Sequence, residues 1–432
     1  MRRSICAATS LPHVIFSSGF PSGRSNCIAF TSFPRSSLVP SHIFMQKNSG
    51  ICVIMMASCR RGARDMESRL RRIDAAQSRG GRMFDKFRLS GAWAAISIAA
   101  AAAGICQPAL AQQSVADFYK GKSIDLIIGY SPGGGYDLYA RTVAQVMSKH
   151  IPGNPNIVPR NMPGAGSLVA AKWVYSVAPK DGTVLATADQ ALPTAQAMGD
   201  KTVSIDTSKL IYIGNPNADN NTTVTWYTSG VKTVEDAKQK EIVIGATGDK
   251  STSAQYPWTM NAVLGTKFKV IVGYPGGNDV NLAMERGEVA GRGSNAWASW
   301  KATRPDWLKD HKINILVQIG LRKASDLPDV PLLFDLAKND QDKALLKLIS
   351  ASTTIGRPLF TTPGVPKDRV DALRKAFDET MKDPEFIAAA KKQKMDLDPV
   401  SGEDLQKIVE EIVATPKPVG ERLLGIINNK GK

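Results

Sequence analysis

The chain has no cysteine after residue 111. All of its cysteines precede that point: Cys6, Cys27, Cys52, Cys59 and Cys106. Residues 112–432 can therefore contain neither a disulfide framework nor a thiolate metal site, and a cysteine nucleophile is excluded there. Histidine is almost as scarce, since this part of the chain holds His150 and His311 alone. No His, Asp and Glu residues have the spacing of a metal site, so we expect neither a metal nor a cofactor.

Positive charge is unevenly distributed. Residues 1–82 contain 13 Lys and Arg against 3 Asp and Glu, so they carry +10 of the formal net charge of +16. Residues 83–111 add +1, which leaves +5 for residues 112–432. That remainder shows no basic patch with interleaved aromatic residues. We therefore expect no nucleic-acid partner.

Residues 83–111 have the pattern of a signal peptide. They begin with a short basic head, continue through an Ala-rich apolar run, and end in the small-residue cleavage pattern Ala-Leu-Ala. An apolar run of about 17 residues is short for a transmembrane anchor. Ile105 stands before Cys106, where a lipoprotein signal needs a small residue, so lipidation is not expected.

Residues 1–82 are rich in Arg and Ser and resemble a transit peptide. A complete bacterial-type signal behind them argues against that interpretation. We expect Met83 to be the true start, with the upstream segment an over-extended translation or, failing that, a disordered one.

We predict that the exported protein is periplasmic and begins at Gln112. N-terminal sequencing of periplasmic material would check this, and a chain that still begins near Met1 would contradict it.

From Ile124 onward, apolar runs alternate with amphipathic segments, which indicates an α/β fold. The run IDLIIGY predicts a strand, and it is followed by a Pro-Gly-Gly-Gly loop and a helix after Asp137. The same order returns around the loops MPGAGS, TGDKSTS and PGGND. We therefore expect four similar loops, in two separate α/β units.

Two lobes are predicted. Residues 112–220 together with 352–432 would form lobe 1, and residues 221–351 would form lobe 2. The chain would cross to lobe 2 through the polar segment 215–225 and return through ASTTIGRPLFTTPG, at 351–364.

The four loops predict a binding cleft for an anion. In parallel α/β sheets, the carboxyl ends of strands meet the amino ends of helices at one edge, where ligands bind. Free N–H groups at helix starts favour anions. A Cβ at Gly134 or Gly164 would block that approach, so valine at either position should abolish binding. The alternative is that these glycines merely permit tight turns.

Three stretches partly match enzyme or nucleotide-binding motifs. The stretch GYSPG matches the nucleophile elbow of serine hydrolases, which remains the alternative function. Pro132 argues against it, because the residue after the nucleophile must donate a backbone N–H to the oxyanion hole. GATGDKST lacks the glycine that a P-loop needs before Lys250. The stretch PGAGSLV has the first two glycines of a dinucleotide-binding fingerprint, but Val169 stands at the position of the third.

The stretches IDLIIGYSPGGGYDLYAR, VPRNMPGAGSLVAAKWV, APKDGTVLATAD and VIVGYPGGNDVNLAMERGEVAG resemble the substrate-binding receptors of tripartite tricarboxylate transporters, the TctC or Bug family. The likeness extends from about residue 122 to the C-terminus. It implies a two-lobed periplasmic binding protein of the Venus-flytrap, type II-like class, each lobe a mainly parallel sheet flanked by helices. It also implies a monomer that hands a small carboxylated solute to the large and small membrane subunits of a transporter.

The resemblance, carried over by position, implies ligand-binding residues in both lobes. They are Tyr130, Ser131, Gly133, Gly134, Gly135, Tyr136, Asp137, Asn161, Gly164, Ala165, Gly166, Ser167, Thr247, Gly248, Ser251, Thr252, Ser253, Tyr274, Gly276 and Gly277.

The chain departs from the family pattern in two places. Gly-Tyr-Ser-Pro stands where Pro-Phe-Pro-Pro is common, and Met162 replaces a usual arginine. Arg160 and Arg292 could restore a charge at the site or could be solvated surface residues. Trp297 and Trp300 could pack in a core or form an aromatic wall of the cleft. Which carboxylate binds stays open.

Overall fold

The structure is a computed structural model that describes residues 113–432. The predicted signal peptide and the segment before it lie outside these residues. Within 113–432, none of the helices combines the length and the apolar character needed to cross a membrane.

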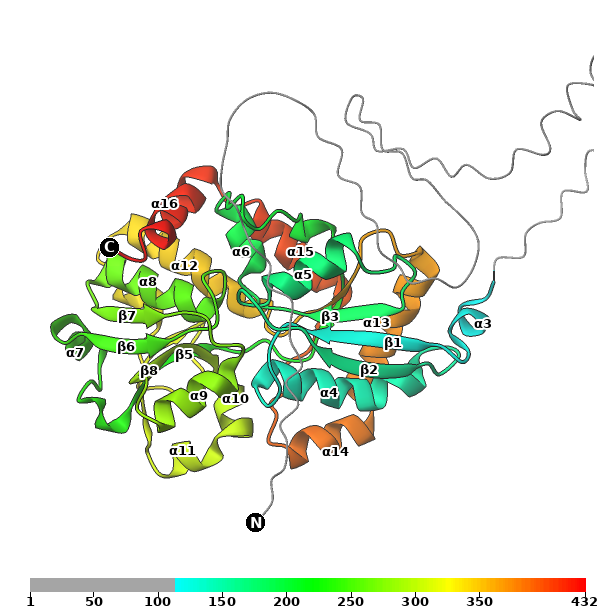
Figure 1. Cartoon of the computed structure of the whole chain (residues 1–432), viewed down its shortest axis with the longest axis horizontal. Coiled ribbons are helices and arrows are strands. Elements are labelled where there is room, and N and C mark those ends of the chain that lie inside the picture. Colours follow the sequence, from blue (N-terminus) through cyan, green and yellow to red (C-terminus); the bar gives the residue numbers. More distant parts are fainter. Residues whose placement is uncertain (1–112) are drawn as a thin grey trace, which may run out of the picture. The chain divides into compact units, whose positions relative to one another are not determined.

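Eleven strands of the described residues form two sheets (Figure 1). The first sheet contains β1 (Ser123–Ile128), β2 (Asn156–Asn161), β3 (Val184–Thr187), β4 (Ile211–Asn215), β10 (Leu359–Thr361) and β11 (Val400–Ser401). The second contains β5 (Asn221–Trp226), β6 (Ile242–Gly245), β7 (Phe268–Ile271), β8 (Gly291–Ala296) and β9 (Ile313–Ile319). We call the first sheet, with the helices that pack on it, lobe 1, and the second sheet, with its own helices, lobe 2. The prediction of two α/β lobes is confirmed.

Both sheets repeat one strand order. The first reads β2-β1-β3-β10-β4, with β11 added at the edge, and the second reads β7-β6-β8-β5-β9. The three strands that open each series are parallel, whereas β10 and β5 pair antiparallel with both neighbours. β5 and β10 are each the first strand that the chain forms after it passes from one lobe to the other. Both sheets are therefore mixed, and the parallel strands end at the edge that carries the predicted loops.

Helices follow the parallel strands directly, as the sequence predicts. They are α4 (Gly135–Met147) after β1, α5 (Leu168–Ser176) after β2, α6 (Leu192–Ala197) after β3, α8 (Thr252–Leu264) after β6, α9 (Gly277–Glu285) after β7 and α10 (Trp297–Thr303) after β8. The remaining helices are α3 (Val115–Tyr119), α7 (Val234–Gln239), α11 (Pro305–Lys309), α12 (Asp340–Ala351), α13 (Lys367–Lys382), α14 (Pro384–Lys392), α15 (Gly402–Val413) and α16 (Lys417–Asn428).

Local side-chain caps start several of these helices. Thr233 and Asp236 form a reciprocal capping box at α7, and the Ser401 hydroxyl accepts the Asp404 N–H at α15. By contrast, α4 and α9 begin without any side-chain cap. Both starts lie at the edge where the sheets face each other, and α5, α6, α8 and α10 also lack a cap from their own N-cap residue.

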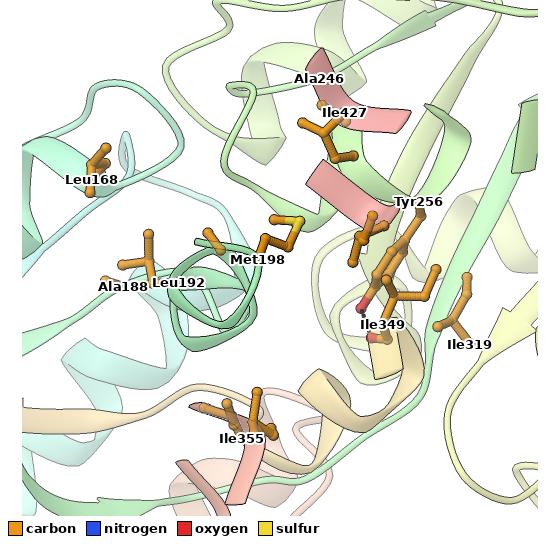
Figure 2. Close-up of a cluster of buried hydrophobic side chains, with 14 of the residues drawn as sticks. Leu168, Ala188, Leu192, Met198, Ala246, Tyr256, Ile319, Ile349, Ile355 and Ile427 are labelled. Atoms are coloured by element: carbon orange, nitrogen blue, oxygen red, sulfur yellow. Dashed lines mark hydrogen bonds between the residues drawn. The ribbon is translucent and has the colours of Figure 1, made fainter. Parts of the chain in front are cut away.

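The largest hydrophobic cluster extends from lobe 1 into lobe 2 (Figure 2). Leu192 and Met198 contribute from α6 and its end, and Tyr256 contributes from α8. Ile427 of α16 belongs to the same cluster, and α16 contacts both α6 and α8. The C-terminal helix therefore packs against both lobes, and the predicted lobe boundaries stay a prediction.

Candidate functional site

A small cavity of about 50 Å³ lies between the lobes at the edge where the loops meet. Eight of the predicted site residues line it: Tyr130, Gly134, Gly135, Tyr136, Thr247, Thr252, Ser253 and Gly277. Further lining residues that the sequence did not single out include Asp189, Asp219, Asn221, Asn295 and Arg357. Both lobes contribute to the walls, so the cavity depends on how the lobes meet.

Two predicted residues that do not line the cavity, Asp137 and Asn161, support the first loop from behind. Asp137 accepts the Gly133 N–H at 3.0 Å and an Asn161 amide N–H at 2.8 Å. Asn161 also donates to the Tyr130 carbonyl, and Arg141 donates to both Asp137 and Asn161. This network holds the turn before α4 in shape, so Asp137 and Asn161 act on the cavity through the loop.

The hydroxyl residues of lobe 2 form a similar internal network. The Thr247 N–H donates to Ser253 Oγ at 3.0 Å, and the hydroxyls of Ser251 and Ser253 lie 2.7 Å apart. Thr247 Oγ1 donates to Ser251 Oγ at 2.9 Å. Thr247 and Ser253 reach the cavity, whereas Ser251 stays behind them.

The glycine loops of the two lobes touch each other directly. The Ser131 N–H donates to the Pro275 carbonyl, and the Ser131 hydroxyl donates to Asp279 of α9. A Cβ on Gly276 would overlap Ser131, and one on Gly248 would overlap Gly166. The predicted loops thus meet in two cross-lobe pairs, and the lobes are closed in this structure.

Part of the predicted second loop lies outside the cavity. Gly164, Ala165, Gly248 and Tyr274 line a separate outer groove, open to solvent. Ser167 turns inward instead, and its hydroxyl accepts the Asp189 N–H at 2.6 Å. These residues shape the contact between the lobes rather than the cavity wall.

Asp189 occupies the start of α8 from the opposite lobe. This buried carboxylate accepts the Thr252 N–H at 3.3 Å, the Ala191 N–H at 2.8 Å and the Tyr130 hydroxyl. Burial raises the pKa of Asp189 to about 6, although these hydrogen bonds oppose the shift. The start of α8, which the sequence assigned to the ligand, is therefore already paired with an anion of the protein.

Asp219 pairs in a similar way with the start of α10. Its carboxylate accepts the Ala298 N–H at 2.6 Å. Desolvation raises the pKa of Asp219 to about 6, and the charge of Arg357 opposes the rise. Both acids of the cavity thus pair with helix starts, whereas α4 and α9 remain uncapped.

The uncapped starts of α4 and α9 face each other across the cavity. A Cβ on Gly134 would lie 3.8 Å from the Gly277 nitrogen and 3.9 Å from the Asn278 nitrogen. Arg292 of β8 lies against the start of α9 so closely that Gly277 has no room for a Cβ. Two helix starts and a guanidinium thus come together in one corner built from both lobes, and Asp137 and Asp279 lie in the first turns of these helices.

Arg292 has no anionic partner among residues 113–432. One guanidinium nitrogen donates to Asn281 Oδ1 at 3.1 Å, but the enclosed Nε has no acceptor. Burial lowers the pKa of Arg292 to about 9, and the nearby Arg304 adds to the effect. At neutral pH the side chain is still charged, so the cavity holds a cation that lacks a counter-ion.

The structure separates the alternatives that the sequence left open. Arg160 is exposed and pairs with Asp125 at the surface, away from the cavity. Trp297 and Trp300 belong to a hydrophobic cluster of lobe 2, and their indole N–H groups donate to Asp326 and Thr222. Neither tryptophan lines the cavity, so the interpretation as core residues is correct.

The geometry around Ser131 does not support a hydrolase. Ser131 donates to Asp279, and its follower Pro132 has no N–H to offer. His150 contacts Asp383 and Glu379 instead. No histidine of residues 113–432 hydrogen-bonds to Ser131.

Residues 139–424 match the model of the tripartite tricarboxylate transporter family receptor, TctC. The chain belongs to this family. A Cupriavidus necator relative, named the UPF0065 protein in the gbd 5' region, is 27% identical over 334 residues, which cover 76% of this chain and 95% of the relative. The TctC family consists of solute-binding receptors, so the chain is a receptor and not an enzyme.

Two solved structures of low identity share the fold. The periplasmic binding protein BugD is 18% identical with a TM-score of 0.58, covering 72% of this chain and 99% of its own. MatC from Rhodopseudomonas palustris, solved with bound malate, is 17% identical with a TM-score of 0.57, covering 70% of this chain and 99% of its own.

Sequence reasoning missed several cavity residues, for which weak signals existed. β8 reads Gly-Arg-Gly-Ser-Asn-Ala, an unusually polar sequence for a strand inside a sheet. That composition indicates a strand whose side chains serve a site. Asp189 and Arg357 carried no such signal, because each lies next to a strand end like many solvated residues.

The pH dependence of stability should reveal Asp189. A carboxyl whose pKa rises from 3.8 to about 6 on folding binds protons more tightly in the folded state, so it favours folding at low pH. The unfolding temperature of the wild type should therefore fall, relative to that of Asp189→Asn, as pH rises from about 4 to 7. The ionised carboxylate would cost on the order of 3 kcal/mol above that window. If calorimetry shows that the unfolding temperatures of the wild type and Asp189→Asn change in parallel with pH, the raised pKa of Asp189 is wrong.

Proposed function

We propose that this chain is a periplasmic, monomeric receptor that binds a small carboxylated metabolite between its lobes. It then delivers the solute to the large and small membrane subunits of a tripartite tricarboxylate-type transporter. The family supports the receptor role, and a relative of the same fold was solved with malate.

One observation carries the choice of a carboxylate. The uncapped helix starts of α4 and α9 face each other beside Arg292, which has no counter-ion among the described residues. Helix starts and a desolvated guanidinium both favour a negative oxygen acceptor. A ligand carboxylate at this corner would bridge the lobes and pair the buried cation.

A screen of carboxylates tests the proposal. Purified protein is mixed with malate, succinate, citrate and benzoate in thermal-shift assays, and each positive is titrated by calorimetry. A ligand present at 100 times its Kd should raise the free energy of unfolding by about 2.7 kcal/mol. Uncharged amides of the same acids serve as controls and should give no shift. If the amides bind as well as the acids, the carboxylate assignment fails.

Ligand binding should also compact the protein. The closed cavity of about 50 Å³ has room for a few water molecules, so the lobes must separate before a larger solute enters. Small-angle scattering should show a smaller radius of gyration with saturating ligand than without. An unchanged radius would indicate that the lobes stay closed and that the ligand binds elsewhere.

A further inference from the structure

We propose that residues 247–253 of lobe 2 form an interlobe latch, which holds Asp189 and Asp200 of lobe 1 and keeps part of the ligand-free receptor closed. This segment, called the latch loop below, lies between β6 and the first turn of α8. The inference rests on the proposed function in one respect, because the closed state is the one that would enclose the ligand.

The latch loop binds anions that the protein itself supplies. It belongs to the stretch GATGDKST, which partly matches a P-loop, and it offers a lysine and the backbone N–H groups of a helix start. Lys250 forms an ion pair with Asp200, and the Thr252 N–H donates to Asp189 at 3.3 Å. Both carboxylates belong to lobe 1, whereas the groups that hold them belong to lobe 2.

The ion pair between the lobes is enclosed. The side chain of Asp200 is 4% exposed and that of Lys250 is 14% exposed. Asp200 also accepts the backbone N–H and the hydroxyl of Thr202, at 2.9 and 2.6 Å, which fixes the carboxylate in the turn after α6. Water screens an enclosed pair less than a surface pair. Removing one partner would leave the other charge desolvated, which costs more than the loss of an exposed ion pair.

Close backbone contacts between the lobes surround the pair. A Cβ on Gly248 would lie 2.4 Å from the Gly166 nitrogen, and one on Gly166 would lie 2.8 Å from Ser251 Cβ. Two loops approach this closely only where the residues in contact lack a side chain. The lobes therefore touch through their backbones on the same segment that carries Lys250.

Opening of the lobes has to break these contacts together. Each lobe carries one partner of the ion pair, so a hinge motion that separates the lobes also separates Lys250 from Asp200. Water solvates either charge in the open state, whereas the closed state desolvates both. Loss of one partner should therefore shift the equilibrium toward the open state. If a ligand binds the closed state alone, its apparent Kd rises as the closed fraction falls, so a latch variant should weaken every ligand by the same factor.

Distance measurements between labelled lobes test the latch without any ligand. All five cysteines precede residue 112, and serine replaces each of them that the purified chain retains. Val177→Cys in lobe 1 and Tyr227→Cys in lobe 2 then carry spin labels at positions that are 66% and 51% exposed. Pulsed electron paramagnetic resonance of the ligand-free protein should show a shorter and a longer distance, which correspond to the closed and the open receptor.

Substitutions of the ion pair should shift the balance between these two distances. Lys250→Met, which removes the charge of the side chain, should lower the ratio of closed to open receptor about tenfold. Asp200→Asn should have a similar effect, because asparagine still accepts the Thr202 N–H but leaves Lys250 without its carboxylate. The double variant should also lower the ratio by about tenfold, whereas independent effects would multiply to about a hundredfold.

Lys238→Met is the matched control. Lys238 pairs with Glu235 on the same helix, α7, so its ion pair does not connect the lobes. This variant should change the ratio of closed to open receptor by less than about twofold. Unfolding temperatures identify any variant that has lost its fold, and Asp200→Asn then supplies the comparison for Lys250→Met.

Three results would overturn the inference. A single long distance in the wild type would show that the latch loop does not hold the ligand-free receptor closed. If Lys250→Met changed the ratio no more than Lys238→Met, or lowered the unfolding temperature alone, the ion pair would have only a structural role. If the effects of the two single substitutions multiplied in the double variant, Lys250 and Asp200 would not act as a pair. Because the measurement uses no ligand, the latch can fail while the carboxylate receptor stands, and the carboxylate screen can fail while the latch stands.

Discussion

Replacing Arg292 with glutamine should lower the affinity for the ligand carboxylate by roughly 10- to 100-fold and raise the unfolding temperature of the ligand-free protein. The loss of affinity follows because hydrogen bonds to a charged group contribute about 1.5–3 kcal/mol. The gain in stability follows because Arg292 is a desolvated cation whose Nε has no acceptor. Glutamine keeps a donor for Asn281 but removes the unpaired charge.

Calorimetry and thermal unfolding would measure both effects on one sample. The screened carboxylate that binds the wild type most tightly is the ligand, and Arg160→Gln is the control for loss of a surface arginine. An unchanged affinity would show that Arg292 does not contact the ligand. A lowered unfolding temperature would show that the buried guanidinium contributes more to the fold than it costs.

Replacing Gly134 with valine should abolish ligand binding while the protein stays folded. Gly134 has a φ of −88°, which any residue adopts, and a Cβ there would meet nitrogens of α9 at ordinary contact distances. The branched side chain would instead fill the corner between the starts of α4 and α9. We expect a loss of stability below about 1 kcal/mol, typical of an unfavourable helix cap.

Gly164→Val is the informative comparison. The sequence predicts the same loss of binding at both glycines, but Gly164 lies in the outer groove and has a φ of +143°. A Cβ there would also approach Val169 at 2.8 Å. Strain of roughly 1–3 kcal/mol should lower the unfolding temperature, with a smaller effect on affinity than Gly134→Val. If Gly134→Val binds like the wild type, the corner is not the carboxylate site.

Local sequence patterns determined much of this protein. The alternation of apolar strands, glycine loops and amphipathic helices predicts the strand–loop–helix units and the two lobes, because hydrophobic periodicity and turn residues act over a few neighbouring positions. The loop motifs also carried the resemblance to the TctC family, which the match over residues 139–424 confirms. Pro132 was enough to argue against a hydrolase, since a missing N–H is a property of one residue.

The tertiary structure decided which of these groups meet. Asp189 pairs with the start of α8 from the other lobe, and the Ser131 loop packs on the loop before α9. Arg292 is more than sixty residues before Arg357 in the sequence, yet both line one cavity. Burial, and with it the charge balance of the site, depends on contacts between segments far apart in the chain. Such contacts form only when both sheets pack together, so no local pattern around an arginine could distinguish an unpaired buried cation from a solvated one.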